Sequence, residues 1–387
     1  MWKHSETEAL SSFILSKREL YKLTAMLLIA TAAFGISGLV IILMMQWMTM
    51  QSYAAESTDK HGIAEIKASR LGGVAVAVAV LVSMAFLLLS GYRGGNINAP
   101  LGFYWPLWLG VWGCFFLGLL EDLRNGSLSP RRRLISKALL LLVVFLLLPS
   151  LVPNSVGIPG VDWLLGFSWL ALAMTLFFSV GFINAVNTVD GANGLLSGIF
   201  TITCLIFSNE TLGLGGYGVA LQSCLYGASL FLIFNVISGR LFLGDAGSYG
   251  IGAAMLLCGL VALSRDVVSL SFLAALYFYP CVDFVVSIGR RIRSGQSITA
   301  PDNDHLHNRV HVFYKRRFSS KNMANSATGL SIAGMSSGLV LCFYVYDAIP
   351  LDSHHWVFVF ALQCAIYATV FVATGARNRM YTRLAEA

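Results

Sequence analysis

Apolar stretches recur along almost the whole chain and are separated by short polar segments. Most are about 17 to 25 residues long with few charges inside them, the length needed to cross a hydrocarbon layer about 30 Å thick as an α-helix. The pattern predicts eleven spans, near 24–48, 72–91, 103–120, 135–151, 165–186, 194–208, 214–237, 248–264, 269–289, 327–346 and 355–375. We therefore expect an all-α polytopic membrane protein with 10 to 11 transmembrane helices.

Composition agrees with this pattern. The chain is 57% hydrophobic and only 12% charged, with a mean hydropathy of +0.73, whereas soluble proteins average about 25% charged residues. A water-soluble protein is excluded. Because no internal repeat or interdomain linker is visible, we expect one membrane domain over residues 1–387, with a spanning core at 24–375 and one long cytoplasmic loop at 290–325.

The distribution of basic residues predicts orientation. The formal net charge of +7 is scattered over short loops and not gathered on a domain, so nucleic acid is not an expected partner. Cytoplasmic loops are enriched in Lys and Arg, and alternate loops place most of them on one side, with only Arg93 and Arg265 on the other. The basic side is expected to be cytoplasmic and to hold the C-terminus.

The N-terminal segment conflicts with this rule. Lys3, Lys17, Arg18 and Lys22 precede the first predicted span and would lie outside if there are eleven spans. Three explanations stay open: the segment is carried across despite its charge, residues 5–22 lie on a membrane surface, or one helix early in the chain has been miscounted.

Polar clusters fall in the loops of the basic side. They are Glu121-Asp122 followed by Arg131, Arg132 and Arg133; Asn184, Asn187, Asp190, Gly191, Asn193 and Gly194; Gly244, Asp245, Gly247 and Ser248; and Asp302, Asp304, His305, His307 and Arg309. Carboxylate and amide oxygens suit Mg²⁺ or Mn²⁺, and Mg²⁺ in particular usually keeps waters and bridges substrate phosphates. Together the clusters predict a site for anionic phosphates and a divalent cation at one membrane face.

Each cluster alone has an ordinary structural explanation. A carboxylate pair after a span is commonly a helix-end charge pair, Gly-Asp-x-Gly-Ser is commonly a turn with a helix cap, and arginines after a span are commonly anchors of orientation. Asp283 differs because a carboxylate inside an apolar stretch is costly. It is either functional or part of an interhelical hydrogen bond near a kink at Pro280, and the sequence does not choose between them.

The order of these motifs resembles the polyprenyl-phosphate N-acetylhexosamine-1-phosphate transferases, a bacterial glycosyltransferase family. The resemblance runs from about residue 60 to 310. It is carried by Asn184-x-x-Asn187-x-x-Asp190-Gly191-x-Asn193-Gly194, Phe242-x-Gly244-Asp245-x-Gly247-Ser248 and His305-Leu306-His307-x-Arg309, supported by Arg70-Leu71-Gly72-Gly73, Asn235 and Pro280-x-x-Asp283.

The resemblance implies a Mg²⁺- or Mn²⁺-dependent enzyme of the bacterial inner membrane, with its active site on the cytoplasmic face. The implied reaction transfers a sugar 1-phosphate from a UDP-N-acetylhexosamine to undecaprenyl phosphate and releases UMP, as the first step of a lipid-linked surface glycan such as O antigen. The implied partners are these two substrates and membrane lipids, and a homodimer is left open.

The resemblance also implies roles for individual residues. Glu121, Asp122, Asp190 and Asp245 are the catalytic candidates, with Asn187 and Asp245 as metal ligands. Gly191, Asn193, His305, His307 and Arg309 are expected to bind the nucleotide sugar. Arg131, Arg133 and Lys137 are expected to hold the lipid phosphate, and Arg70 and Asp283 are further candidates.

Two departures from the family pattern affect these expectations. Glu121 stands where the family usually has aspartate, and prolines are missing before Arg70. The His-Leu-His cluster resembles the N-acetylhexosamine branch and disfavours a phospho-N-acetylmuramoyl-pentapeptide transferase. The other functions considered are a transporter of a nucleotide sugar or anion, disfavoured because the polar clusters lie at span ends, and a non-catalytic scaffold.

Overall fold

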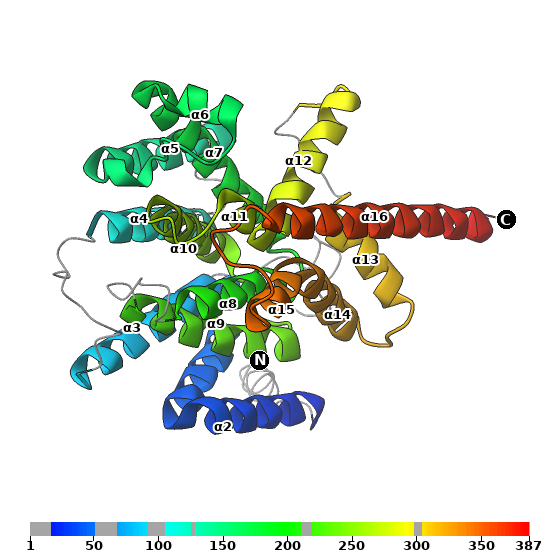
Figure 1. Ribbon diagram of the computed structural model, residues 1–387. Helices are drawn as coiled ribbons and strands as arrows, with labels where there is room; N and C mark the ends of the chain where they lie inside the picture. The colour runs from blue at the N-terminus through cyan, green and yellow to red at the C-terminus, as the bar shows by residue number, and fades with distance from the viewer. Residues whose placement is uncertain are drawn as a thin grey trace.

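In the computed structural model the chain is a bundle of α-helices (Figure 1). Residues 17–50, 68–91, 105–124, 128–209, 218–297 and 304–386 are described. Within these ranges there is no β-sheet, only an isolated parallel bridge between Ser69 and Leu241. The N-terminal residue Lys3 and the loop residues Arg93 and Asp302 named above lie outside the described residues.

The helices follow one another through short connections. They are α2 (Lys17–Met48), α3 (Gly72–Leu89), α4 (Trp105–Leu123), α5 (Pro130–Leu147), the 3₁₀ turn η2 (Pro149–Leu151), α6 (Pro159–Leu165), α7 (Ser168–Val189), α8 (Leu195–Phe207), α9 (Gly218–Ser238), α10 (Gly244–Ser264), α11 (Leu270–Leu276), α12 (Phe278–Arg293), α13 (Leu306–Lys315), α14 (Lys321–Ala333), the π-turn η5 (Gly334–Gly338), α15 (Leu339–Val345) and α16 (Trp356–Glu386).

The expectation of an all-α polytopic membrane protein is confirmed, but the spans are less uniform than the apolar pattern predicts. Seven described helices are long and apolar enough to cross a membrane, or eight if α11 and α12 form one span. The other predicted spans correspond to α2, α5 and α8. Helix α5 carries four basic residues near its start, and α8 has only 13 residues, so neither resembles a typical isolated span.

The backbone bends sharply inside two of the predicted spans. The first, at 24–48, falls on α2, which loses helical geometry at Gly35, where φ is 65° and ψ is −153°. The span at 269–289 is divided into α11 and α12, which meet at an angle of 80°. Pro280 lies in the first turn of α12, where its missing N–H is tolerated.

The long polar segment at 290–325 is also more ordered than a loop. It contains the end of α12, the whole of α13 and the start of α14. Helix α13 begins directly after His305 and presents buried Leu306 and His307 to the rest of the protein. The segment therefore holds the His-Leu-His cluster at a helix start.

Helix α10 is the central element of the bundle, and it packs against α3, α4, α7 and α8. Glycines allow this closeness. A Cβ on Gly73 would lie 2.3 Å from the backbone nitrogen of Gly247, and one on Gly118 would lie 2.1 Å from the carbonyl oxygen of Asp245. The starts of α3 and α10 and the end of α4 therefore meet at one end of the bundle.

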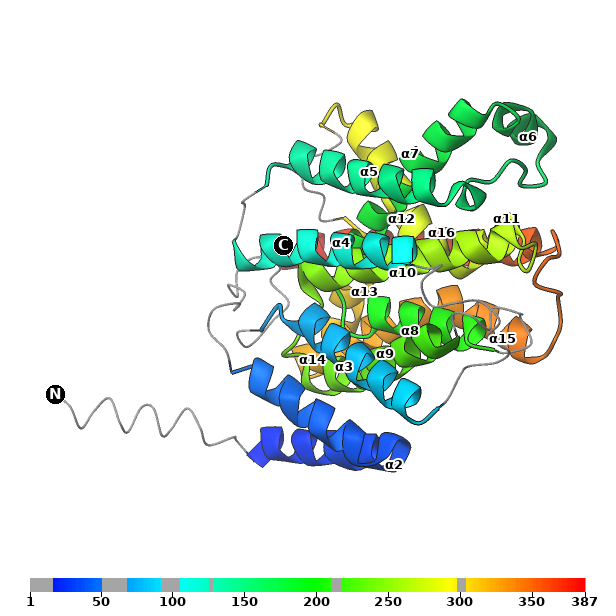
Figure 2. The ribbon, with the colours of Figure 1, turned by 90° about the vertical axis from the view of Figure 1, so that its left-hand side faces the viewer.

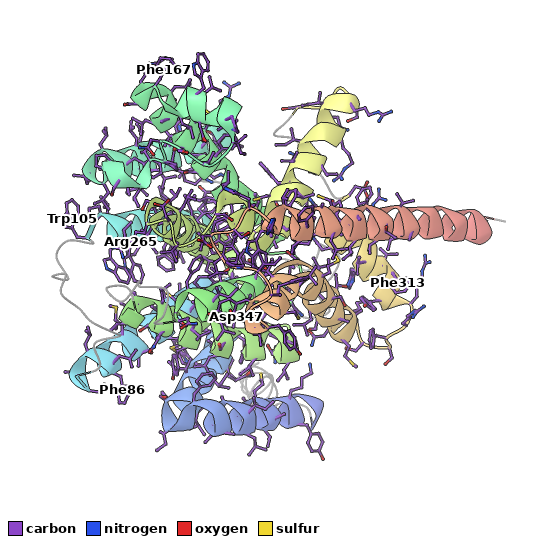
Figure 3. All side chains as sticks on the ribbon, in the orientation of Figure 1. Phe86, Trp105, Phe167, Arg265, Phe313 and Asp347 are labelled. Atoms are coloured by element: carbon purple, nitrogen blue, oxygen red, sulfur yellow. The ribbon has the colours of Figure 1, made fainter. Side chains whose placement is uncertain are left out.

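The two ends of the bundle carry different segments. Figure 3 shows Phe86 near the end of α3, Trp105 at the start of α4 and Arg265 after α10 toward one side, whereas Phe313 of α13 lies toward the other. Helix α16 also ends on the side of α13 (Figure 1). The end of α4 and the starts of α3, α10 and α13, which carry motif residues, lie on this second side, which we call the site end.

Candidate active site

Two carboxylates hold the start of α10. Asp122, at the end of α4, accepts hydrogen bonds from the backbone amides of Asp245 at 3.0 Å and Ala246 at 2.8 Å. Asp190, which follows α7, accepts one from the amide of Gly244 at 3.0 Å. These amides have no acceptor within their own helix, and negative charge is stabilising there. The arrangement ties three separate loops together around Asp245.

Asp245 itself keeps contact with solvent. Its side chain is 27% exposed, and its Oδ2 lies 4.0 Å from the guanidinium of Arg133. Asn187 hydrogen-bonds the same carboxylate, and the charge of Arg70 acts on it as well. Ser248 Oγ donates to Asn187 Oδ1 and so fixes the amide. A carboxylate beside an amide and two guanidinium groups can hold phosphate groups and a cation together.

The donors around Asp245 fit magnesium better than zinc. Among the described residues no group of three or more His, Cys, Asp or Glu is placed to hold a metal ion, so a closed zinc site is absent from this part of the chain. Asp245 and Asn187 offer hard oxygen atoms. Mg²⁺ is usually held by one or two carboxylates and completes its coordination with water and substrate phosphates.

Glu121 contacts Leu128, which precedes α5, and Arg133 in the first turns of α5. Its Oε1 accepts from the backbone amide of Leu128 at 2.7 Å, and its Oε2 lies 3.8 Å from Arg133 Nε. Arg133 Nε also donates to the carbonyl of Leu128 at 3.2 Å. Glu121 is only 4% exposed. The extra methylene relative to aspartate is therefore used to reach across the turn and brace Arg133.

The other two basic residues of the predicted lipid-phosphate site lie differently. Arg131 is exposed at the start of α5. Lys137 is buried, donates to Asn184 Oδ1 at 2.5 Å and stands 4.0 Å from the centre of the Tyr249 ring. Lys137 is a buried charge that acts on Asp245. The guanidinium of Arg133 lies 4.0 Å from the partly exposed Asp245 carboxylate.

The loop after α7 meets the His-Leu-His cluster. A Cβ on Gly191 would lie 2.8 Å from His307 Nε2, so only glycine leaves room for this ring. His307 Nδ1 is hydrogen-bonded to the Tyr279 hydroxyl at 2.9 Å. Gly191 and His307, more than 100 residues apart in sequence, are brought together here, as the family resemblance implies.

Asn193 is buried more deeply than expected for a side chain that contacts the nucleotide. It is 1% exposed, and its Nδ2 donates to Asn322 Oδ1 at 2.9 Å and to Ser326 Oγ at 3.4 Å. Asn235 joins Gly194 to the segment before α10, because its Oδ1 accepts from the Gly194 amide at 2.6 Å and its Nδ2 donates to the Leu241 carbonyl at 2.8 Å. Both asparagines therefore hold loops in place.

A buried carboxylate orients His305. Asp283, on α12, is 1% exposed and lies 2.6 Å from His305 Nδ1. The same carboxylate accepts from the Leu306 amide at 3.1 Å and the Tyr367 hydroxyl at 2.7 Å. The His305 and His307 rings stack with their planes 4° apart. Of the two readings of Asp283, the interhelical hydrogen bond is present, and it positions a predicted site residue.

Arg309 is engaged outside the Asp245 cluster. Its guanidinium forms two hydrogen bonds with Asp304, at 2.6 and 2.5 Å, and donates to the Phe371 carbonyl at 3.0 Å. It also lies 3.7 Å from the centre of the Phe371 ring. These contacts fasten the start of α13 to α16.

The structure brings the predicted residues into two connected groups. Arg70, Glu121, Asp122, Arg133, Asn187, Asp190 and Asp245 surround the start of α10, and Gly191, Asp283, His305 and His307 form the second group. Sequence reasoning missed Tyr249, Tyr279 and Tyr367. They lie in apolar stretches without a motif, and no sequence signal separates them from other membrane aromatics.

Comparison with known proteins shows similarity to one family over part of the chain. The model of the family "Glycosyl transferase family 4" matches residues 104–263. A probable undecaprenyl-phosphate N-acetylglucosaminyl 1-phosphate transferase of Bacillus subtilis (strain 168) is 27% identical over 249 residues, covering 63% of this chain and 66% of the relative.

A phospho-N-acetylmuramoyl-pentapeptide-transferase of Bacillus mycoides (strain KBAB4) is 30% identical over 194 residues, covering 48% of this chain and 58% of that relative. In both cases the match spans less than two thirds of the relative's length. Residues 104–263 include α4, α5, α7 and the start of α10, so the similarity to glycosyl transferase family 4 covers most of the helices around Asp245.

Proposed function

We propose that the protein transfers an N-acetylhexosamine 1-phosphate from a UDP-sugar to undecaprenyl phosphate and releases UMP. The observation that carries the proposal is the partly exposed Asp245 carboxylate, fixed at the start of α10 by Asp122 and Asp190 and accompanied by Arg133 and Arg70. This site lies at the ends of apolar helices, where a lipid-linked phosphate and a water-soluble nucleotide can both arrive.

The reaction requires little covalent chemistry from the protein. An oxygen of the lipid phosphate forms a bond to the β-phosphorus of the UDP-sugar, and the bond from that phosphorus to the oxygen bridging it to the α-phosphate breaks. The bridging oxygen leaves with UMP. Because a phosphate monoester with a second pKa of about 6 is mostly dianionic at pH 7, the nucleophile needs positioning and charge neutralisation more than a general base.

The side chains of the site can provide both the positioning and the charge neutralisation. Arg133 is the proposed ligand of the lipid phosphate, since a guanidinium fork matches phosphate oxygens. Asp245 and Asn187 are the proposed metal ligands, and Mg²⁺ bound there would neutralise charge on the diphosphate and on departing UMP. Asp122 and Asp190 act through the backbone of α10, so we assign them positioning roles.

The nucleotide sugar is proposed to lie between the two groups of residues. His305 and His307 stack at the start of α13, with His307 Nε2 facing Gly191. Histidine N–H groups at this place can donate to the oxygens of the sugar diphosphate. UDP-N-acetylglucosamine is the first candidate, because the relative from Bacillus subtilis is named for N-acetylglucosaminyl 1-phosphate transfer.

The orientation belongs to the same proposal. UDP-sugars are cytoplasmic, and the basic residues of the loops lie on the side of the site end. We therefore place the protein in the bacterial inner membrane with its active site on the cytoplasmic face, at the start of a lipid-linked surface glycan.

The test is UMP release and lipid product formation by the purified full chain with undecaprenyl phosphate, Mg²⁺ and a panel of UDP-sugars. Product is expected with a UDP-N-acetylhexosamine and only when the lipid acceptor is present. Asp245→Asn should lower turnover about 10²–10³-fold, as expected when an electrostatic contact to the transition state is lost. Asp352→Asn, exposed at the opposite end, is the matched control. Normal turnover by a folded Asp245→Asn protein contradicts the proposal.

A further inference from the structure

Helix α2 is broken at its middle. Gly35 has φ 65° and ψ −153°, close to a region of backbone conformations essentially restricted to glycine. The break leaves two shorter apolar arms, Tyr21–Ala32 and Phe34–Met48. At a rise of about 1.5 Å per residue they are about 18 and 22 Å long, whereas a hydrocarbon core is about 30 Å thick. Neither arm crosses a bilayer alone.

The two arms fold against each other. A Cβ on Gly38 of the second arm would lie 2.5 Å from the carbonyl oxygen of Ala30 on the first, and Ala30 is fully buried. Small residues allow this kind of close helix approach in membranes. The polar backbone at the bend is also partly satisfied, because Ser37 Oγ donates to the Phe34 carbonyl at 2.8 Å. Such pairing is required of a bend that lies inside hydrocarbon.

Both ends of α2 point toward the site end of the molecule. Figure 2 shows the two arms returning from the bend so that the start and end of α2 lie on the left, where α3 begins and α16 ends. The bend lies toward the opposite side. Figure 1 agrees, with the bend to the left and both ends of α2 to its right.

The hairpin has one face on the protein and one face open. Phe34 meets Tyr226 of α9 edge to face, with ring centres 5.2 Å apart, and Ile42 and Met45 are buried. The open face carries large exposed apolar side chains: Leu28, Ile29, Ile36, Val40, Leu43 and Trp47. Acyl chains of the leaflet from which the hairpin enters are the occupant that this face fits.

The charges favour the same arrangement. Lys17 and Arg18 begin α2, and Lys22 is the second residue of the first arm. If α2 crossed the membrane, they would lie opposite the site end and conflict with the enrichment of basic residues in cytoplasmic loops. If α2 is a hairpin, they join the other basic residues, and only Arg93 and Arg265 remain on the far side. At the site end Lys22 can meet anionic lipid headgroups.

We propose that residues 21–48 form a re-entrant hairpin that enters and leaves the bilayer at the site end. Helix α3, which follows α2, begins at the site end, and α16 ends there (Figure 2). A hairpin therefore places the segment before α2 on the same side as the end of α16. The proposal does not depend on the enzymatic activity.

Labelling of single cysteines with a membrane-impermeant maleimide tests the proposal in the full chain. Ser16→Cys reports the segment before α2. Ser294→Cys is the matched control at the site end, after α12, and Ser150→Cys the one at the far end, in η2; both native serines are exposed. The seven native cysteines lie in apolar stretches, so the unmodified chain measures the background. Labelling is compared in sealed vesicles of each orientation.

The hairpin predicts that Ser16→Cys is labelled in the same vesicles as Ser294→Cys and protected in those that label Ser150→Cys. Labelling together with Ser150→Cys overturns the proposal, since α2 would then cross the membrane. Labelling from both sides also overturns it. So does a thiol that reacts only after detergent is added, because the segment would then be inside the bilayer. All three comparisons hold whichever face proves cytoplasmic.

Discussion

Replacing Asp283 with asparagine should impair the function of His305. Because the two side chains have nearly the same size, the substitution leaves no cavity in the core. The carboxylate accepts three hydrogen bonds, from His305, the Leu306 amide and the Tyr367 hydroxyl. In the Asp283→Asn variant, the side-chain oxygen can still accept from the Leu306 amide and the Tyr367 hydroxyl. The NH₂ group then faces His305 Nδ1. The ring must then accept at Nδ1 and carry its proton on Nε2, and the cationic form loses its partner.

The size of the effect follows from the short contact. A hydrogen bond that involves a charged group contributes about 1.5–3 kcal/mol, and the 2.6 Å separation between His305 Nδ1 and Asp283 belongs to this class. If that energy is lost in the transition state, turnover falls about 10- to 160-fold. Tyr367→Phe removes only a donor hydroxyl and should cost about 0.5–1.5 kcal/mol, or about 2- to 12-fold.

The assay is steady-state UMP release at saturating lipid acceptor, with thermal unfolding as the measure of folding. Asp283→Asn is made in the parent chain and in His305→Ala. Since the carboxylate is argued to act through the ring, the double variant should be no slower than His305→Ala alone. Parental turnover by Asp283→Asn, or the same fold loss in both backgrounds, would refute a positioning role through His305.

Three further predictions concern the cluster at the start of α10. Glu121→Asp should lower turnover several-fold although aspartate is the usual family residue, because the shorter side chain cannot accept the 2.7 Å hydrogen bond from the Leu128 amide. Unchanged UMP release would show that this hydrogen bond is not needed for activity. Gly118→Ala should abolish activity and lower the Tm, since its Cβ would lie 2.1 Å from the Asp245 carbonyl, whereas Gly181→Ala, with open space around it, should be neutral; a normal Tm for Gly118→Ala would mean that α4 can shift freely. Chelation by EDTA should stop UMP release and added Mg²⁺ or Mn²⁺ should restore it, and activity that persists after thorough chelation would count against the metal assignment.

The amino-acid sequence alone determined the class of this protein. Bilayer thickness sets the length of apolar helices, so long apolar stretches predict an all-α membrane protein without knowledge of their packing. The order of the polar motifs also indicated which family the chain resembles. Both conclusions depend on properties that are local along the chain, which is why the sequence sufficed for them.

The positions at which the helices break inside apolar stretches could not be predicted from the sequence. Gly35 divides α2 and Tyr277 separates α11 from α12, yet glycine and proline also occur inside membrane helices that remain continuous. Whether such a residue bends the chain depends on the neighbours that pack against it. The Ala30–Gly38 contact, which closes the α2 hairpin, is one such neighbour.

Only the tertiary structure decided what each charged residue of the motifs does. Asp245, Asp122, Lys137 and Arg309 all lie in promising motifs, but they differ in their partners. Asp245 remains partly open, Asp122 caps the amides of α10, Lys137 is buried under Tyr249 and Arg309 is paired with Asp304. The free energy of a charge depends on the burial and hydrogen bonds supplied by distant segments, and these arise only when the helices have packed.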